Sequence, residues 1–341
     1  MSKRFKLLLI VLIVALSAVF MVQFKNSHSA KERLREAGIR YYRLGLYDDA
    51  SECFALALRQ REAFDTKYDR DIYFYLADAE MKQKDYSSAI TYYEKLVGIG
   101  EKSKDLYGNL GICYHEQGKD ELCYENLKLA SSAEDADSTV IYTLMLTCEN
   151  LGRFSEVEEY AKQGYRMMSS SLTKESKEAV KSNDKSLTTK VKTELKQYAT
   201  FAYLNAKYDE AYQAFKLLFD SGEDDVAPYL ASTIIEQGKY EEALNMLLSY
   251  LDKYETNALV DAKLVYCYMQ LKRYEDALAL IDQAMAYPSQ GCQKELLYEK
   301  GVALEYTGDF DEAYSCFSEY VEKYSDDANA KRELDFLSSR I

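Results

Sequence analysis

An aromatic side chain followed three residues later by a small one returns along this chain at a nearly constant interval. The pairs are Tyr47/Ala50, Tyr86/Ala89, Phe154/Val157, Tyr208/Ala211, Tyr240/Ala243, Tyr274/Ala277 and Phe310/Ala313, with a weaker pair, Asp120/Cys123, in the one vacant place. The interval is similar at every step except the one from Phe154 to Tyr208, which is clearly longer. A period of roughly 34 residues in a sequence of helical character predicts a repeat array.

The first copy indicates what the repeated positions do. In residues 33–58, RLREAGIRYYRLGLYDDASECFALAL, small residues allow two helices to approach closely. Gly45 suits the left-handed conformation that ends a first helix, and the acidic residues after Tyr47 cap a second helix and meet its dipole. The segment resembles the tetratricopeptide repeat, a pair of antiparallel helices in about 34 residues. With Lys31 taken as the first position, the residues at the family's signature positions are Ala37, Gly38, Tyr41, Gly45, Tyr47, Ala50, Phe54 and Ala57, while Leu34 stands where the family often has Trp.

This resemblance covers residues 31–327 and implies an all-α fold. We expect a right-handed α-solenoid of about eight helix pairs similar to tetratricopeptide repeats, preceded by one N-terminal transmembrane or signal helix. The expected segments are a basic region 1–6, a transmembrane or signal-anchor helix 7–24, a linker 25–30, repeats one to four in 31–171, a polar insertion rich in Lys, Ser and Thr in 172–191, repeats five to eight in 192–327 and a capping helix in 328–341. A cap is expected because a terminal repeat otherwise exposes its stacking face. The insertion is expected to be partly helical and to divide the array into two arms, or else to be a length variant without a role.

Residues 7–24 form an uncharged apolar run between Lys6 and Lys25. As a helix the run spans about 27 Å, close to the roughly 30 Å hydrocarbon core of a bilayer. A single-pass anchor in the cell membrane is the favoured interpretation, although the small-x-small site at 15–17 leaves cleavage and secretion open. The basic tail favours an extracytoplasmic array under the positive-inside rule. Unpaired cysteines suit the reducing cytoplasm, which stays the alternative.

Composition narrows the function. The 43 basic and 57 acidic residues give a net charge of −14, which argues against nucleic acid, since that partner needs a basic surface. Only two prolines occur, and helix formers dominate, as in an all-α protein. Seven cysteines without a CxxC motif, and two histidines, His28 and His115, provide no metal-binding or catalytic signature. We therefore expect no enzyme activity, no metal and no cofactor.

The family resemblance implies that the concave face is lined by positions 2, 5, 9, 12 and 13 of each first helix. The candidate partner-binding residues at these positions are Phe74, Asp78, Met81, Asp105, Ile112, His115, Glu116, Tyr142, Leu146, Glu149, Tyr203, Ile235, Glu236, Tyr266, Met269, Tyr298, Glu305 and Tyr306, with Ser232 and Glu295 beside them. Such a groove is aromatic and acidic, and it complements a protein or peptide with basic or apolar anchors. The alternative is that many of these rings only pack between neighbouring first helices.

Two functions follow from this pattern. The first is a membrane-anchored protein-interaction scaffold that binds a peptide or protein segment in the groove. The second is a ligand- or peptide-sensing regulatory protein in which segment 172–191 acts as a hinge and reports binding to a membrane effector. The sequence names neither the partner nor the pathway.

Overall fold

The computed structural model describes residues 28–60, 68–131, 137–255, 258–286 and 293–340. Helices joined by short turns make up these residues, and no β-strand occurs among them. The chain forms two compact units, Met1–Tyr160 and Ala161–Ile341, which are described separately. The predicted transmembrane helix 7–24 lies outside the described residues. Within the described ranges, no helix combines the length and the apolar character that a membrane span requires.

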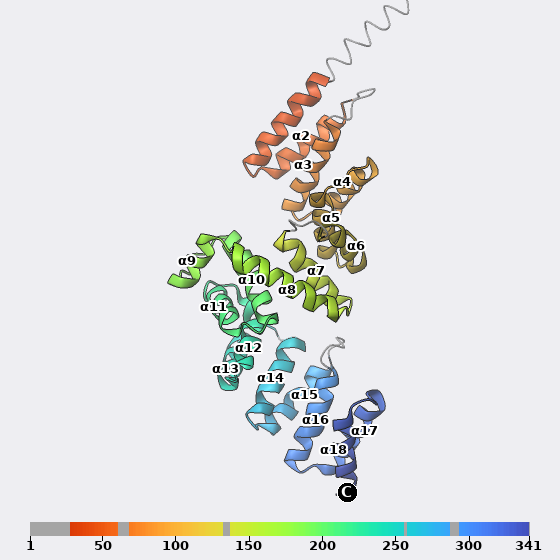
Figure 1. Cartoon of the computed structure of the whole chain (residues 1–341), viewed down its shortest axis with the longest axis vertical. Coiled ribbons are helices and arrows are strands. Elements are labelled where there is room, and N and C mark those ends of the chain that lie inside the picture. The colour runs from red at the N-terminus through yellow and green to blue at the C-terminus, as the bar shows by residue number, and fades with distance from the viewer. Residues whose placement is uncertain (1–27, 61–67, 132–136, 256–257, 287–292, 341) are drawn as a thin grey trace, which may run out of the picture. The chain divides into compact units, whose positions relative to one another are not determined.

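Unit 1 is a series of antiparallel helix pairs in chain order (Figure 1). A helical segment at residues 28–43 comes first. Its side chains Leu34, Ile39 and Tyr42 pack against a core formed by residues of the next two helices, α2 and α3. The labelled helices are α2 (Tyr47–Leu58), α3 (Asp69–Lys82), α4 (Tyr86–Gly98), α5 (Lys104–Glu116), α6 (Asp120–Ser131), α7 (Ser138–Asn150) and the first turns of α8 (Phe154–Ser171).

Unit 2 continues from within α8 with the same alternation (Figure 1). Its helices are α9 (Lys174–Ser182), α10 (Thr189–Leu204), α11 (Tyr208–Asp220), a short 3-10 turn η1 (Asp224–Val226), α12 (Ala227–Glu236), α13 (Tyr240–Leu251), α14 (Ala258–Gln270), α15 (Tyr274–Met285), α16 (Gln293–Thr307), α17 (Phe310–Lys323) and α18 (Ala328–Ser338). The first helices α10, α12, α14 and α16 alternate with the second helices α11, α13, α15 and α17, so the described residues form an all-helical repeat array.

The small residues of the repeated pairs lie at the seam between the two helices of a repeat, as predicted. The alanines Ala50, Ala89, Ala211, Ala243, Ala277 and Ala313 are fully buried. Glycine makes a still closer approach possible in some first helices. A Cβ on Gly111 would lie 2.5 Å from a methyl carbon of Leu127, and one on Gly301 would lie 2.7 Å from the Phe317 ring. These close contacts hold the paired helices together.

The fourth repeat breaks this pattern. Phe154 is 68% exposed, although its position in the repeat is that of a packed aromatic. The buried side chains of the same helix, Tyr160, Ala161 and Met168, lie further along it. The sequence pair Phe154/Val157 therefore marks where α8 begins but not what it buries, and the boundary between the two compact units falls within this helix.

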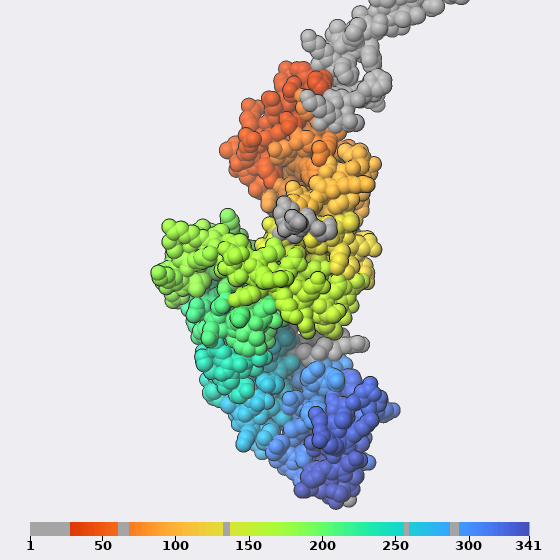
Figure 2. Space-filling model, in the orientation of Figure 1, coloured from red at the N-terminus to blue at the C-terminus, as the bar shows by residue number. Residues whose placement is uncertain are grey.

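The polar insertion is held against unit 2. The Glu194 carboxylate of α10 accepts hydrogen bonds from the Thr173 backbone N–H (2.8 Å), the Thr173 hydroxyl (2.7 Å) and the Ser176 hydroxyl (2.5 Å). Helix α9 packs on α10 and α11, and it projects at the left edge of the space-filling view (Figure 2). At the other end of unit 2, α18 packs on α17 and buries Ala330 and Leu337.

Candidate functional site

The candidate residues all lie on first helices, namely α3, α5, α7, α10, α12, α14 and α16. The exposed ones are Asp105, Glu116, Glu149, Glu236, Tyr266 and Tyr306. Met269 is buried, at 7% exposure, and belongs to the core rather than to a surface. The other candidates are half-buried. Their neighbours decide which of them are available to a partner.

Several candidates in unit 1 join neighbouring repeats. The Tyr42 hydroxyl donates a hydrogen bond to the Asp78 carboxylate. Burial and this carboxylate together raise the pKa of Tyr42 well above its usual value. Tyr86 at the start of α4 lies near Glu116 on α5, and burial, followed by the charge of Glu116, raises the pKa of Tyr86. Asp78 thus helps to hold one repeat on the next, and Glu116 lies beside a tyrosine of the preceding repeat.

His115 lies beside a buried polar pair. The Thr147 hydroxyl donates to the Thr143 carbonyl oxygen at 2.8 Å, and its oxygen lies 3.1 Å from the Cys123 sulfur and 3.5 Å from His115 Nδ1. Burial raises the pKa of the Cys123 thiol to about 11, so the sulfur is protonated at neutral pH. The arrangement contains no thiolate nucleophile.

In unit 2, Glu236 lies among tyrosines from neighbouring helices. Tyr208 at the start of α11 and Tyr203 at the end of α10 both lie near the Glu236 carboxylate. The rings of Tyr203 and Tyr208 contact each other with centroids 5.8 Å apart. Burial, followed by the charge of Glu236, raises the pKa of both tyrosines. Glu236 is thus an exposed carboxylate at the end of α12 with two tyrosines beside it.

A cavity of about 340 Å³ opens next to Glu236, between α12, α14 and α16. It is lined by Ile235, Glu236, Leu259, Ala262, Lys263, Tyr266 and Glu295. Three of the candidates, Ile235, Glu236 and Tyr266, are thereby brought together with Glu295. The Tyr266 ring is braced by an edge contact with Tyr240, with centroids 6.3 Å apart and an interplanar angle of 66°.

The cavity also contains residues that were not among the candidates. Leu259 and Ala262 occupy positions 2 and 5 of the repeat that begins at 258, so the same positional rule reaches them. Lys263 follows at position 6, where the rule predicts no groove residue. Burial raises the pKa of Tyr266, and the neighbouring groups Tyr240, Glu236 and Glu299 add to this effect. Glu299 lies one turn after Glu295 on α16, and burial raises its own pKa.

The candidates on α16 mostly pack internally. Tyr306 stacks on Tyr274 with centroids 4.5 Å apart and an interplanar angle of 5°. Tyr298 contacts the rings of Phe317 and Tyr320, each at 5.5 Å. Burial, followed by the charge of Glu333, raises the pKa of Glu305. Tyr306 thus joins the last repeat to the one before it, whereas Tyr298 packs within the last repeat. Of these two rings, Tyr306 fits the alternative that rings pack between neighbouring repeats.

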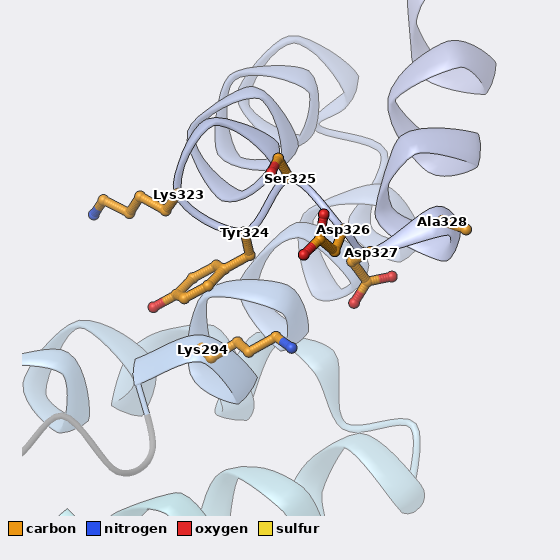
Figure 3. Close-up of a pocket in the computed structure, with 7 residues that line it drawn as sticks. All are labelled: Lys294, Lys323, Tyr324, Ser325, Asp326, Asp327 and Ala328. Carbon is orange, nitrogen blue, oxygen red and sulfur yellow. The ribbon is translucent and has the colours of Figure 1, made fainter.

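A second cavity, of about 540 Å³, lies where α17 meets α18. Figure 3 shows Lys294 of α16 beneath the loop that carries Asp326 and Asp327. Asp327 caps α18 by accepting from the backbone N–H groups of Asn329 and Ala330, and it also accepts from the Tyr320 hydroxyl at 2.9 Å. The Lys294 ammonium lies over the Tyr324 ring at 5.7 Å. Because these polar groups bind one another, we assign this cavity to the joint between the last repeat and its cap.

Most cysteines in the part of the chain that the structure describes are buried, and potential metal ligands do not cluster there. No group of three or more His, Cys, Asp or Glu side chains is placed there to hold a metal ion. Five cysteines, Cys113, Cys123, Cys148, Cys267 and Cys316, are buried, and burial raises the pKa of Cys113 to about 12 and those of the other four to about 11. They behave as small apolar side chains.

Comparison with known protein families identifies the repeats. Models described as tetratricopeptide repeat match residues 35–105, 235–290 and 295–327. These segments are similar to tetratricopeptide repeats. The matched ranges include Glu236, Tyr266 and Glu295, so the cavity lies within the matched part of unit 2. None of the matching models describes a catalytic family.

Solved structures similar to this chain are more distant. A tetratricopeptide repeat protein from Parabacteroides merdae is 17% identical, with 80% of this chain and 98% of that chain covered and a TM-score of 0.44. The Cut9–Hcn1 hetero-tetramer of APC/C is 13% identical, with 91% and 70% covered and a TM-score of 0.48. YrrB, a tetratricopeptide repeat protein with an unusual peptide-binding site, is 16% identical, with 62% and 96% covered and a TM-score of 0.40. A comparison with curated proteins gave no match.

Proposed function

We propose that this protein is an interaction scaffold that binds a peptide or protein segment on the tetratricopeptide repeats of unit 2. The observation that carries the proposal is the cavity between α12, α14 and α16, where Glu236, Tyr266 and Glu295 come together around about 340 Å³. First helices of successive repeats supply its walls, so a segment lying across them contacts several repeats at once. A shallow site of this kind favours an extended chain or a helix.

The partner's chemistry follows from the lining. Apolar side chains of Ile235, Leu259 and Ala262 suit an apolar anchor, and the carboxylates of Glu236 and Glu295 suit a basic one. Tyrosine is common at binding hot spots because its ring combines apolar area with a polar hydroxyl. A protein or peptide with basic or apolar anchors is therefore the partner that we propose.

The apolar run at 7–24 supports a membrane location for this scaffold. It is uncharged, and basic residues flank it on both sides. We propose that it anchors the protein in the cell membrane as a single span, with the repeats on the extracytoplasmic side as the basic tail favours. Anchoring confines the scaffold to two dimensions and brings membrane-associated partners together.

Site-specific photo-crosslinking in living cells tests the scaffold function. A benzophenone amino acid replaces Tyr266 in the full-length protein or, as the matched control, Tyr254, since these two tyrosines are 39% and 40% exposed. We expect a discrete crosslinked protein from position 266 only. Glu236→Lys should abolish that product, whereas Glu242→Lys, on the exposed first turn of α13, should not. Absence of a product at 266, or the same product from both positions, would contradict the proposed function.

A further inference from the structure

We propose that the cavity between α12, α14 and α16 holds one arginine side chain of the bound segment. This inference rests on the proposed function and specifies the chemistry of its anchor. The proposed function allows basic or apolar anchors, whereas this inference assigns a single arginine side chain to this cavity. Three features of the cavity support it: its charge, its aromatic wall and its apolar floor.

The charge of the cavity suits a single cation. Its lining contains two carboxylates, Glu236 and Glu295, and one ammonium group, Lys263, which together leave one negative charge. The Glu236 carboxylate lies beside Tyr203 and Tyr208. One monovalent cation therefore neutralises the cavity.

The aromatic wall favours a flat cation. Tyr266 lines the cavity and is 39% exposed, and its ring is braced by Tyr240. A cation over a tyrosine ring is attracted by the electrons of the ring face. A guanidinium group stacks on such a ring, and its N–H groups form a planar fork that suits carboxylates. The more strongly hydrated ammonium group of lysine has no such planar fork.

The floor of the cavity suits the stem of the same side chain. Ile235, Leu259 and Ala262 are apolar and line the space beside the charged groups. Long basic side chains lay their methylene groups along apolar surface while the charged head keeps polar neighbours. An arginine can thus place its stem on these residues and its head near Tyr266 and the two carboxylates.

Small matched probes test the assignment on the full-length protein in detergent micelles. N-acetyl-arginine amide is titrated by ligand-observed NMR beside N-acetyl-citrulline amide, which has nearly the same shape without the charge, and beside N-acetyl-lysine amide. We expect the arginine probe to bind at least about tenfold more tightly than citrulline, since charged pairs lose most of their stabilisation when one charge is removed. The affinity of the lysine probe should lie between those of the arginine and citrulline probes. Equal binding of arginine and citrulline would overturn the inference, as would tighter binding of lysine than of arginine.

Substitutions locate the probe in the cavity. Glu236→Gln and Tyr266→Leu should each weaken arginine binding about threefold or more, whereas Tyr266→Phe should retain it because the ring remains. The control Glu242→Gln changes a carboxylate on the exposed first turn of α13 and should leave the titration unchanged. If Tyr266→Phe weakens arginine binding as much as Tyr266→Leu does, the probe does not bind at the Tyr266 ring. If Glu242→Gln weakens it as much as Glu236→Gln does, the probe does not bind at Glu236.

The two proposals fail in different ways. If position 266 crosslinks to a partner but arginine shows no advantage over citrulline, the scaffold function stands and the arginine site is wrong. If the arginine probe binds as expected and no protein crosslinks at 266, the arginine site stands and the scaffold function is wrong.

Discussion

Replacing Gly164 by alanine should loosen the packing of α8 on α10 in unit 2. A Cβ at this position would lie 2.2, 2.4 and 2.5 Å from three carbons of the Phe201 ring. Carbon atoms pack best at about 3.5–4.0 Å, so the ring would have to move by more than about 1 Å. Phe201 is fully buried, and a close-packed interior offers it little room.

Two opposing effects determine how much Gly164→Ala changes the free energy of unfolding. Alanine in the interior of a helix is favoured over glycine by about 1 kcal/mol. Overpacking a well-packed core costs about 1–3 kcal/mol, and a contact this short belongs at the upper end of that range. The expected net loss for Gly164→Ala is therefore about 1–2 kcal/mol. Gly98→Ala is the matched control, because no heavy atom lies within 4 Å of its added Cβ, and it should be neutral or slightly stabilising.

Hydrogen exchange measured by mass spectrometry is the appropriate assay, because a long repeat array need not unfold in one step. Protection of α8 and α10 amides should fall about 5- to 30-fold in Gly164→Ala. Phe201→Leu in the same chain should restore part of the lost protection, because it removes ring atoms from the overlap. Unchanged or increased protection in Gly164→Ala would refute the packing argument, since helix propensity alone predicts an increase.

Three further predictions concern stability. Glu194→Gln should speed exchange in α9 by about tenfold, since charged hydrogen bonds hold that helix. Burial raises the pKa of Glu194, but the hydrogen bonds from Ser176 and Thr173 outweigh it and lower the pKa overall, so this stabilisation is present above the unfolded pKa and is lost as pH falls through the folded value. If hydrogen exchange in α9 responds neither to Glu194→Gln nor to the fall in pH, the role of Glu194 is contradicted. Asp327→Ala should cost α18 about 0.5–2 kcal/mol by removing its N-cap, whereas Asp335→Ala on the same helix should cost far less; equal exchange in the two variants would contradict the capping role. The buried thiols of Cys123 and Cys267 have pKa values raised by burial from 9.0 to about 11, so their stabilising contribution is complete below about pH 9 and is lost as pH rises to about 11. The urea concentration at the midpoint of unfolding should therefore fall between about pH 9 and about pH 11. A midpoint that stays constant over this interval would contradict the prediction.

The repeat pattern predicts the fold because it reports local packing. A small residue is needed in every repeat where the two helices of a pair touch, and Ala211 and Ala243 are fully buried for that reason. The same local rule places Gly45 and Gly118 in the left-handed turns that end first helices. Lys84, Ala206 and Lys272 take this backbone conformation without being glycine, since the surrounding helices fix the turn. The pattern is less informative in α8, where Phe154 is exposed and Tyr160 is buried instead.

The groove positions were harder to interpret because position in a repeat does not specify a side chain's partner. Several long side chains at these positions turn toward the adjacent repeat. Asp78 accepts a hydrogen bond from Tyr42, Glu116 lies near Tyr86, and Tyr306 stacks on Tyr274. In the last two pairs the partner is the aromatic residue that begins the preceding second helix. The repeated aromatic therefore has a second role beyond its own helix pair, which a search within a single repeat does not reveal.

Whether a small groove residue opens a cavity depends on the repeat that follows it. Gly108 and Ala262 both occupy the fifth position of a repeat, and both leave room at the surface of a first helix. Beside Gly108 the space is occupied, because a Cβ there would lie 3.2 Å from a methyl carbon of Val140 on α7. Beside Ala262 the residue at the position of Val140 is Leu296 of α16, which belongs to a buried cluster against which Ala262 packs, while the preceding Glu295 lines the cavity together with Ala262. The lining of this cavity therefore comes from successive repeats, and a rule that considers the positions of one repeat at a time does not specify it.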